Sequence, residues 1–68
     1  MKIRIDFTTG DWVHITNICG FVSQGDKVSV NLKMNSIVDE SYDVPEQERE
    51  CELRRDYTNV SGVVIADE

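Results

Sequence analysis

The chain has few residues of the types that do chemistry, and their spacing is the first guide to function. His14 is the only histidine, and Cys19 and Cys51 are the only cysteines. The cysteines lack the Cys-x-x-Cys spacing of a zinc or redox motif, so we expect free thiols, with Cys19 half buried. Because these residues come from separate parts of the chain, neither a metal site nor a cofactor is predicted.

Nucleophiles and acid/base pairs are not arranged for catalysis either. Ser61 and Cys19 have no histidine predicted close enough to activate them. The carboxylates between Glu46 and Glu52 alternate along solvated positions, where a close pair with a shifted pKa is not expected. The sequence also contains no glycine-rich phosphate loop. We therefore expect a non-catalytic protein rather than an enzyme.

Negative charge is placed unevenly along the chain, whose net charge is −6. Through Val38 there are four Lys or Arg against three Asp, a balance of +1, and from Asp39 to Glu68 there are ten acids against three Arg, a balance of −7. Such a surface repels phosphate backbones and anionic membranes, so direct nucleic-acid or membrane binding is not expected. A basic protein partner fits this charge.

The acidic residues of the second half form a first candidate interaction surface, the acidic run. Placed against a basic cleft, they would make the protein an acidic inhibitor or a nucleic-acid mimic. The alternative is that these charges only solvate one face of the protein. Three of the acids, at positions 39, 40 and 43, lack the spacing and the glycine of a calcium loop. The residues of the acidic run are Asp39, Glu40, Asp43, Glu46, Glu48, Glu50 and Glu52.

A second candidate surface depends on a hairpin at the start of the chain. Apolar residues alternate with polar ones over 3–7 and continue beyond a turn at 9–11. A three-residue loop at this turn keeps the apolar side chains on one face by setting Phe7 against Val13. The same register places Asp6 opposite His14 on the outer face.

The outer face of this hairpin carries Arg4, Trp12 and His14. A carboxylate across the strand favours the charged form of an imidazole, so one interpretation is a pH-sensitive or ligand-contacting patch. The other is an ordinary surface pair in which the indole covers part of the sheet. An exposed indole is also a point of self-association, and a homo-oligomer is among our expectations.

The alternation continues into a third strand. We expect the second strand to run on to Val22 and to bend at Gly20, where a missing side chain permits it. A two-residue loop at Gln24-Gly25 then sets Phe21 against Val28 and leads into a strand over 27–34. The first half of the chain is thus predicted to be a three-stranded meander.

The second half is less regular. An exposed loop or irregular edge is expected over 35–45. Residues 46–55 have types that favour a short helix, but their apolar stripe is only one turn long and the alternation over 50–54 favours a strand, so both remain open. A closing strand is expected over 63–65. Because it is apolar on both faces, it is predicted to be centrally paired or to close a barrel, and to meet the first strand.

Two segments of the chain nearly repeat each other, TNICGFV over 16–22 and TNVSGVV over 58–64. An identical Asn and Gly flanked by apolar residues predict one backbone device used twice, a bend that leads into a buried strand. The residues before the two segments share no pattern, which argues against duplication. The bends are predicted at Asn17, Gly20, Asn59 and Gly62.

These elements predict an all-β protein, either a small, strongly bent five-stranded antiparallel sheet or an SH3-like barrel. The alternative is an α+β fold with one short helix near 45–55. The first half resembles the opening of Sm-like RNA-binding barrels, through Gly10 after a strand and an alternating run that ends at Leu32 and Met34. The Asp and Asn pair of that family is absent at the matching spacing, as is its basic surface. The resemblance therefore implies shared architecture rather than membership.

The 68 residues make one small domain, 1–68, with few positions left for a buried pocket. Neither an apolar leader nor a run long enough to span a membrane is present, so a soluble cytoplasmic protein is expected. We expect a non-catalytic protein-interaction or accessory module with a protein partner. The acidic inhibitor or nucleic-acid mimic is the alternative function.

Overall fold

The computed structural model describes residues 1–41 and 53–66, and every regular element in these ranges is a β-strand. The expected all-β class is confirmed. The predicted helix or strand within 46–55 lies largely outside the described residues, and the strand that follows it begins at Arg54. The strands are β1 (Ile3–Phe7), β2 (Trp12–Thr16), β3 (Gly20–Gln24), β4 (Lys27–Asn31), β5 (Ile37–Glu40), β6 (Arg54–Tyr57) and β7 (Val60–Ile65).

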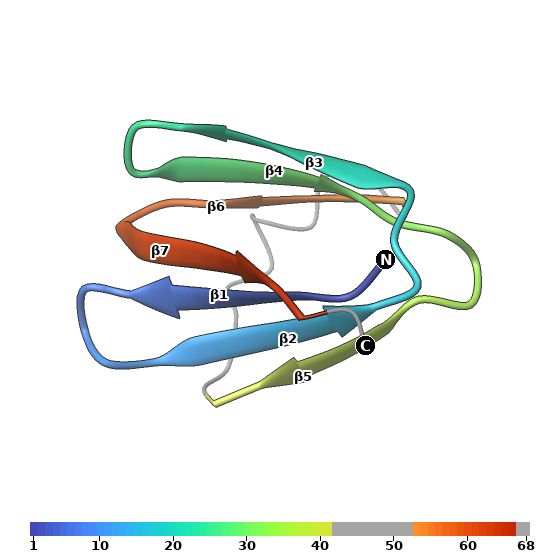
Figure 1. Ribbon diagram of the computed structural model, residues 1–68, viewed down its shortest axis with the longest axis horizontal. Helices are drawn as coiled ribbons and strands as arrows, with labels where there is room; N and C mark the ends of the chain where they lie inside the picture. Colours follow the sequence, from blue (N-terminus) through green and yellow to red (C-terminus); the bar gives the residue numbers. More distant parts are fainter. Residues whose placement is uncertain (42–52, 67–68) are drawn as a thin grey trace.

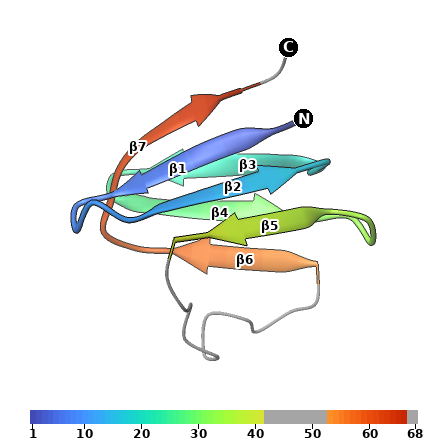
Figure 2. The same cartoon turned by 90° about the horizontal axis from the view of Figure 1, so that it is seen from below.

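The strands form two antiparallel sheets that face each other (Figures 1 and 2). The four-stranded sheet has the order β5-β2-β1-β7, and the three-stranded sheet has the order β3-β4-β6. Within the described residues the sheets are not closed into a barrel. Instead of one five-stranded sheet, the described residues form two sheets with seven strands in all, because the long second strand is divided and β5 forms within the expected irregular edge.

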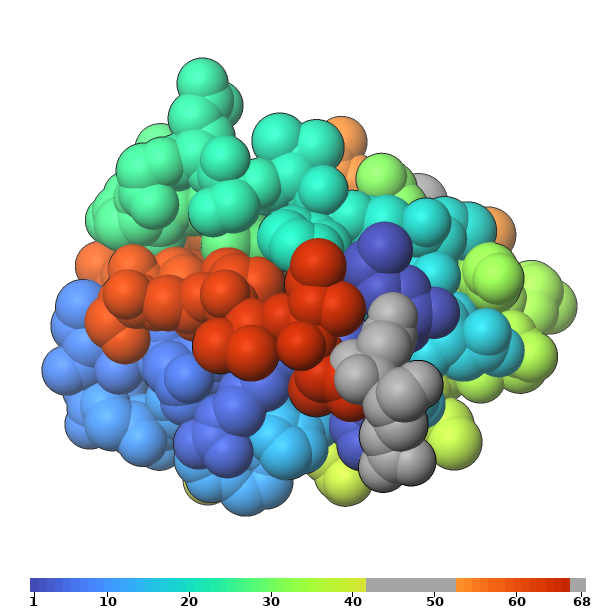
Figure 3. Space-filling model, viewed as in Figure 1, coloured from blue at the N-terminus to red at the C-terminus, as the bar shows by residue number. Residues whose placement is uncertain are grey.

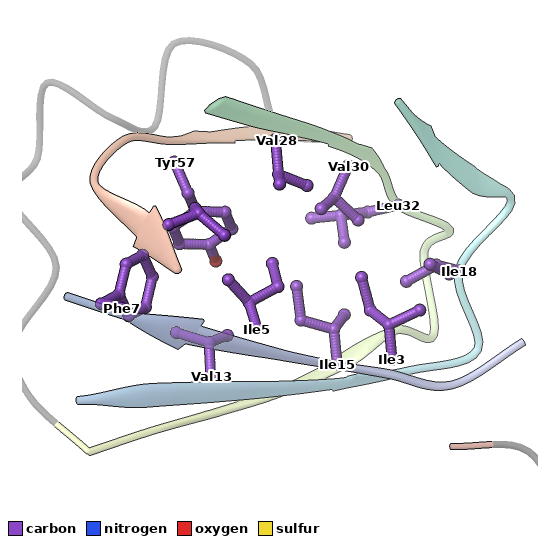
Figure 4. Packing of buried hydrophobic residues seen from close by; sticks show 11 residues of the cluster. Ile3, Ile5, Phe7, Val13, Ile15, Ile18, Val28, Val30, Leu32 and Tyr57 are labelled. Carbon is purple, nitrogen blue, oxygen red and sulfur yellow. The ribbon is translucent and has the colours of Figure 1, made fainter. Parts of the chain in front are cut away.

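The core fills the space between the two sheets (Figure 4). Alternation along β1, β2 and β4 directs every second side chain inward, as the sequence pattern predicted. Each fully buried aliphatic side chain contributes about 1.5–3 kcal/mol relative to exposure. Among the described residues, the core consists of Ile3, Ile5, Phe7, Val13, Ile15, Ile18, Val28, Val30, Leu32, Tyr57 and Val60.

Two of the connections that carry the chain from one sheet to the other, which we term corners, coincide with the two repeated segments. β2 leads to β3 across residues 17–19, and β6 leads to β7 across residues 58–59. The asparagine of each corner has a left-handed backbone, with φ 60° at Asn17 and 58° at Asn59. The next residue, Ile18 or Val60, is buried in the core. One backbone device is thus used twice, and each use changes sheets.

The bends lie at the asparagines rather than at Gly20 and Gly62. Neither glycine has a positive φ, and a Cβ built on either would meet no atom within 4 Å. Each corner is instead held by a backbone hydrogen bond from the buried residue after the asparagine. The N–H of Ile18 donates to the carbonyl oxygen of Met1 at 3.0 Å, and the N–H of Val60 donates to that of Asp26 at 2.9 Å.

The first hairpin is shifted by two residues from the predicted register, since Ile5 rather than Phe7 lies opposite Val13. The loop explains the shift. The N–H of Phe7 donates to the carbonyl oxygen of Asp11 at 2.9 Å, so the loop consists of Thr8-Thr9-Gly10. Gly10 has φ 93°, a conformation that glycine adopts without strain.

The hairpin of β3 and β4 is shifted in the same way, because Phe21 lies opposite Val30 rather than Val28. Its loop is Gly25-Asp26, and Gly25 has φ 62°, which suits glycine at the first position of a two-residue hairpin loop. A shift by two residues exchanges the cross-strand partners but leaves every side chain on its predicted face.

The last strand pairs with the first, as predicted, but its position in the sheet was predicted wrongly. β7 is antiparallel to β1, with Ile65 opposite Ile3. It lies at the edge of the four-stranded sheet rather than in the centre. Val64 and Ile65 are consequently 56% exposed.

At the edge of the four-stranded sheet opposite β7, an ion pair joins the edge strands β5 and β6 of the two sheets. Arg55 of β6 donates from Nη1 to Oε1 of Glu40 in β5 at 3.0 Å, and the two side chains are only 16% and 15% exposed. Burial alone would lower the pKa of Arg55, but the neighbouring Tyr57 and Glu40 outweigh it and raise that pKa above its usual value. The pair therefore ties β5 to β6 along this side.

Candidate functional site

The candidate site is the outer face of the four-stranded sheet, the face that points away from the core. Its cross-strand neighbours follow from the observed register. Val64, Arg4, His14 and Asp39 form one row, and Gly62, Asp6 and Trp12 form the next. Arg4, Trp12 and His14, predicted to share this face, are therefore brought together on adjacent strands.

Trp12 lies at the centre of this cluster, which we term the Trp12 patch and define as Arg4, Asp6, Trp12 and His14. The ring centroids of Trp12 and His14 are 4.9 Å apart with an interplanar angle of 48°. The guanidinium carbon of Arg4 lies 5.7 Å from the indole centroid. A cation over an indole contributes about 0.5–1 kcal/mol at an exposed site, so the contact orients both side chains.

Arg4 is fixed by a second contact along its own strand. Its Nε donates to Oδ1 of Asp6 at 2.9 Å. Its Nη1 also lies 3.4 Å from Nε2 of His14. Because a guanidinium can only donate, this contact requires Nε2 to be the unprotonated nitrogen of the imidazole.

The predicted pair of Asp6 and His14 is not formed. Asp6 lies opposite Trp12, and Arg4 lies opposite His14, because of the shifted register. The other strand neighbour of His14 is Asp39 in β5. Asp6 instead holds Arg4, its neighbour two residues away on the same face of β1.

The backbone of Trp12 is held by a segment remote in sequence. Its N–H donates to Oγ of Ser41 at 2.8 Å, and its carbonyl oxygen accepts from the N–H of Ser41 at 3.0 Å. The hydroxyl of Ser41 donates in turn to Oδ1 of Asp11 at 3.2 Å. Sequence reasoning missed this support, because no local pattern links positions 12 and 41.

Only the beginning of the acidic run lies within the described residues. Asp39 is exposed beside His14 on the outer face. Glu40 points to the other side of β5, where it pairs with Arg55. The remaining members, Asp43, Glu46, Glu48, Glu50 and Glu52, lie outside the described residues.

Other residues considered for chemistry are scattered. Ser61 of β7 donates from Oγ to the carbonyl oxygen of Asp6 at 3.2 Å, and Cys19 is an exposed free thiol rather than half buried. Over residues 1–41 and 53–66, no group of three or more His, Cys, Asp or Glu is placed to hold a metal ion. In the same ranges no helix is long and apolar enough to cross a membrane.

Comparisons with protein-family models, curated proteins and solved structures found no match to this chain.

Proposed function

We propose that the protein is a non-catalytic interaction module that binds a protein partner through the Trp12 patch. The observation that carries the proposal is the ordered contact of Trp12 with both Arg4 and His14. Tryptophan and arginine dominate the binding energy of protein interfaces, where they act as central anchors.

Preorganisation supports the same function. Ordering a long side chain at an interface costs about 0.5–1.5 kcal/mol. Arg4 is already restrained by Asp6 and by the indole, and the Trp12 backbone is held by Ser41. The patch also lies on paired strands of a sheet rather than on a loop. A partner that covers it therefore meets side chains that need little further ordering.

The proposal is tested by affinity capture from a lysate of the organism that encodes the chain. The wild type is compared with Trp12→Ala and with Val22→Ala, an exposed apolar position on the other sheet. We expect a partner that is retained by the wild type and by Val22→Ala and is lost with Trp12→Ala. Capture of the same partner by all three proteins, each shown to be folded by circular dichroism, would contradict the proposal.

The salt dependence of the captured complex separates this function from acidic mimicry. Charge pairing with a basic cleft weakens steeply as the Debye length falls from about 10 Å at 0.1 M salt to about 3 Å at 1 M. A contact centred on the indole changes little over this range. If salt elutes the captured partner and the Trp12→Ala variant captures it as well as the wild type does, the acidic inhibitor or nucleic-acid mimic is favoured.

A further inference from the structure

The outer edge of β7 is not paired with another strand in the part of the chain that the structure describes. β7 is the last strand of the four-stranded sheet, and its strand partner is β1. In the space-filling view β7 lies at the surface between β1 (blue) and β3 of the other sheet (teal) (Figure 3). A free strand edge is a template for pairing with another chain.

The direction of the backbone groups follows from the ladder with β1. The N–H of Ala66 donates to the carbonyl oxygen of Lys2 at 2.8 Å, which makes these two residues a hydrogen-bonded pair. In an antiparallel ladder such pairs alternate, so Gly62 and Val64 also direct their N–H and C=O groups towards β1. The backbone groups of Val63 and Ile65 therefore point away from the sheet.

This edge lacks the features that protect strand edges from pairing. Residues 60–66 contain neither a charged residue nor proline, although the chain carries a net charge of −6. Val64 and Ile65 are each 56% exposed. Of the other edge strands, β5 and β6 carry charged residues and are tied together by Arg55 and Glu40, whereas β3, with the sequence GFVSQ, is also uncharged.

We propose that β7 pairs in antiparallel fashion with β7 of a second copy, about a two-fold axis at Val63. The two four-stranded sheets then continue into one sheet of eight strands. A closed two-fold pairing uses the same edge on both subunits, and it terminates there. The inference does not rest on the proposed function, because the Trp12 patch lies on other strands.

Two observations favour a second copy as the occupant. The neutral edge lets two copies of an acidic protein meet without opposing like charges across the new ladder. The register centred on Val63 also places Val64 opposite Gly62 of the partner subunit, so a large exposed side chain meets a position without one. The bulge where Asp6 and Phe7 meet β7 lies before this stretch and leaves 62–65 in regular register.

Sedimentation across a concentration series tests the proposal. The wild type is expected to pass from monomer to dimer, with a dissociation constant in the micromolar range because one strand pair makes a small interface. Val64→Lys and Val64→Glu place like charges diagonally across the axis and should each raise that constant at least about tenfold. Val22→Lys, a matched change at the exposed edge of the other sheet, should leave it unchanged.

Mixing the two charged variants provides the most specific test of the proposed pairing. Val64→Lys and Val64→Glu should form a mixed dimer, because opposite charges then lie diagonally across the axis. Amide exchange gives an independent readout: the N–H groups of Val63 and Ile65 should gain protection as the wild type dimerises. A wild type that stays monomeric overturns the proposal, and so does a dimer that survives both charged variants or leaves these amides unprotected.

Discussion

The two corner asparagines provide the most direct test of how this sequence specifies its fold. Asn17 and Asn59 have φ 60° and 58°, where a side chain with a Cβ approaches the following carbonyl oxygen. Left-handed backbone costs an ordinary residue about 1–2 kcal/mol. Asparagine tolerates the region better than alanine, so we take the lower end, about 1 kcal/mol, as the loss from Asn to Ala at each corner.

The double variant Asn17→Ala with Asn59→Ala should lose the sum of these effects. The corners hydrogen-bond to different parts of the chain, Met1 and Asp26, so their contributions should add. The expected loss is about 2 kcal/mol, which lowers the melting temperature of a domain of this size by about 8–16 °C. Replacement of both asparagines by glycine, which pays no cost for a positive φ, should stay within about 1 kcal/mol of the parent.

Urea and thermal unfolding followed by far-UV circular dichroism provide the measurement. Asn35→Ala is the matched control, because Asn35 is exposed and is not among the residues with a positive φ. Gly20→Ala and Gly62→Ala should also leave stability unchanged, since an added Cβ meets no atom within 4 Å. The reasoning is refuted if the double alanine variant melts like the parent, or if the double glycine variant loses as much as the alanine one.

Two further predictions concern charged groups. Arg55→Met and Glu40→Gln should each lower the free energy of unfolding by about 1–3 kcal/mol, because each leaves a largely buried charge without its partner. The double variant should lose less than the sum of the two single losses. Strictly additive losses in urea unfolding would contradict this prediction. A hydrogen bond from Ser29, aided by Arg54, outweighs desolvation and lowers the pKa of Asp56 below 3.8. Asp56 therefore stabilises the folded state above about pH 4, and this contribution is lost as the pH falls through the pKa of Asp56 in the folded protein. In Asp56→Asn the free energy of unfolding should fall less steeply with decreasing pH than in the wild type. An unchanged pH dependence below about pH 4 would show that the interactions of Asp56 with Ser29 and Arg54 contribute nothing to stability.

The alternation of apolar residues was sufficient to predict which faces the strands of the first half bury. It did not predict that the long second strand divides into β2 and β3 of different sheets, so the expected three-stranded meander is not formed. Ile3, Ile5, Val13 and Ile15 are all fully buried, as this pattern requires. The pattern could not fix the register, because a shift by two residues keeps every side chain on its face. The register of the first hairpin depends on which position of the loop Gly10 occupies with its positive φ, and the sequence alone does not fix that position.

The same limit applies to the candidate site. The shared face of Arg4, Trp12 and His14 was predictable from alternation, but their contacts depend on the register. Apolar composition was also ambiguous over 63–65: it predicts a central or barrel-closing strand, whereas the structure places Val64 and Ile65 on an edge strand. A central strand and an edge strand with exposed apolar side chains have the same residue types, so composition does not separate them.

The pairing of the first strand with the last has a consequence for biosynthesis. β1 lies between β2 and β7, so its two neighbours come from opposite ends of the chain. During translation β1 can pair with β2 early, but its other edge stays open until residues 60–65 have left the ribosome. Contacts between distant residues also form slowly, because a long loop must close first. The four-stranded sheet of the nascent chain therefore stays incomplete until β7 has been made and can pair with β1.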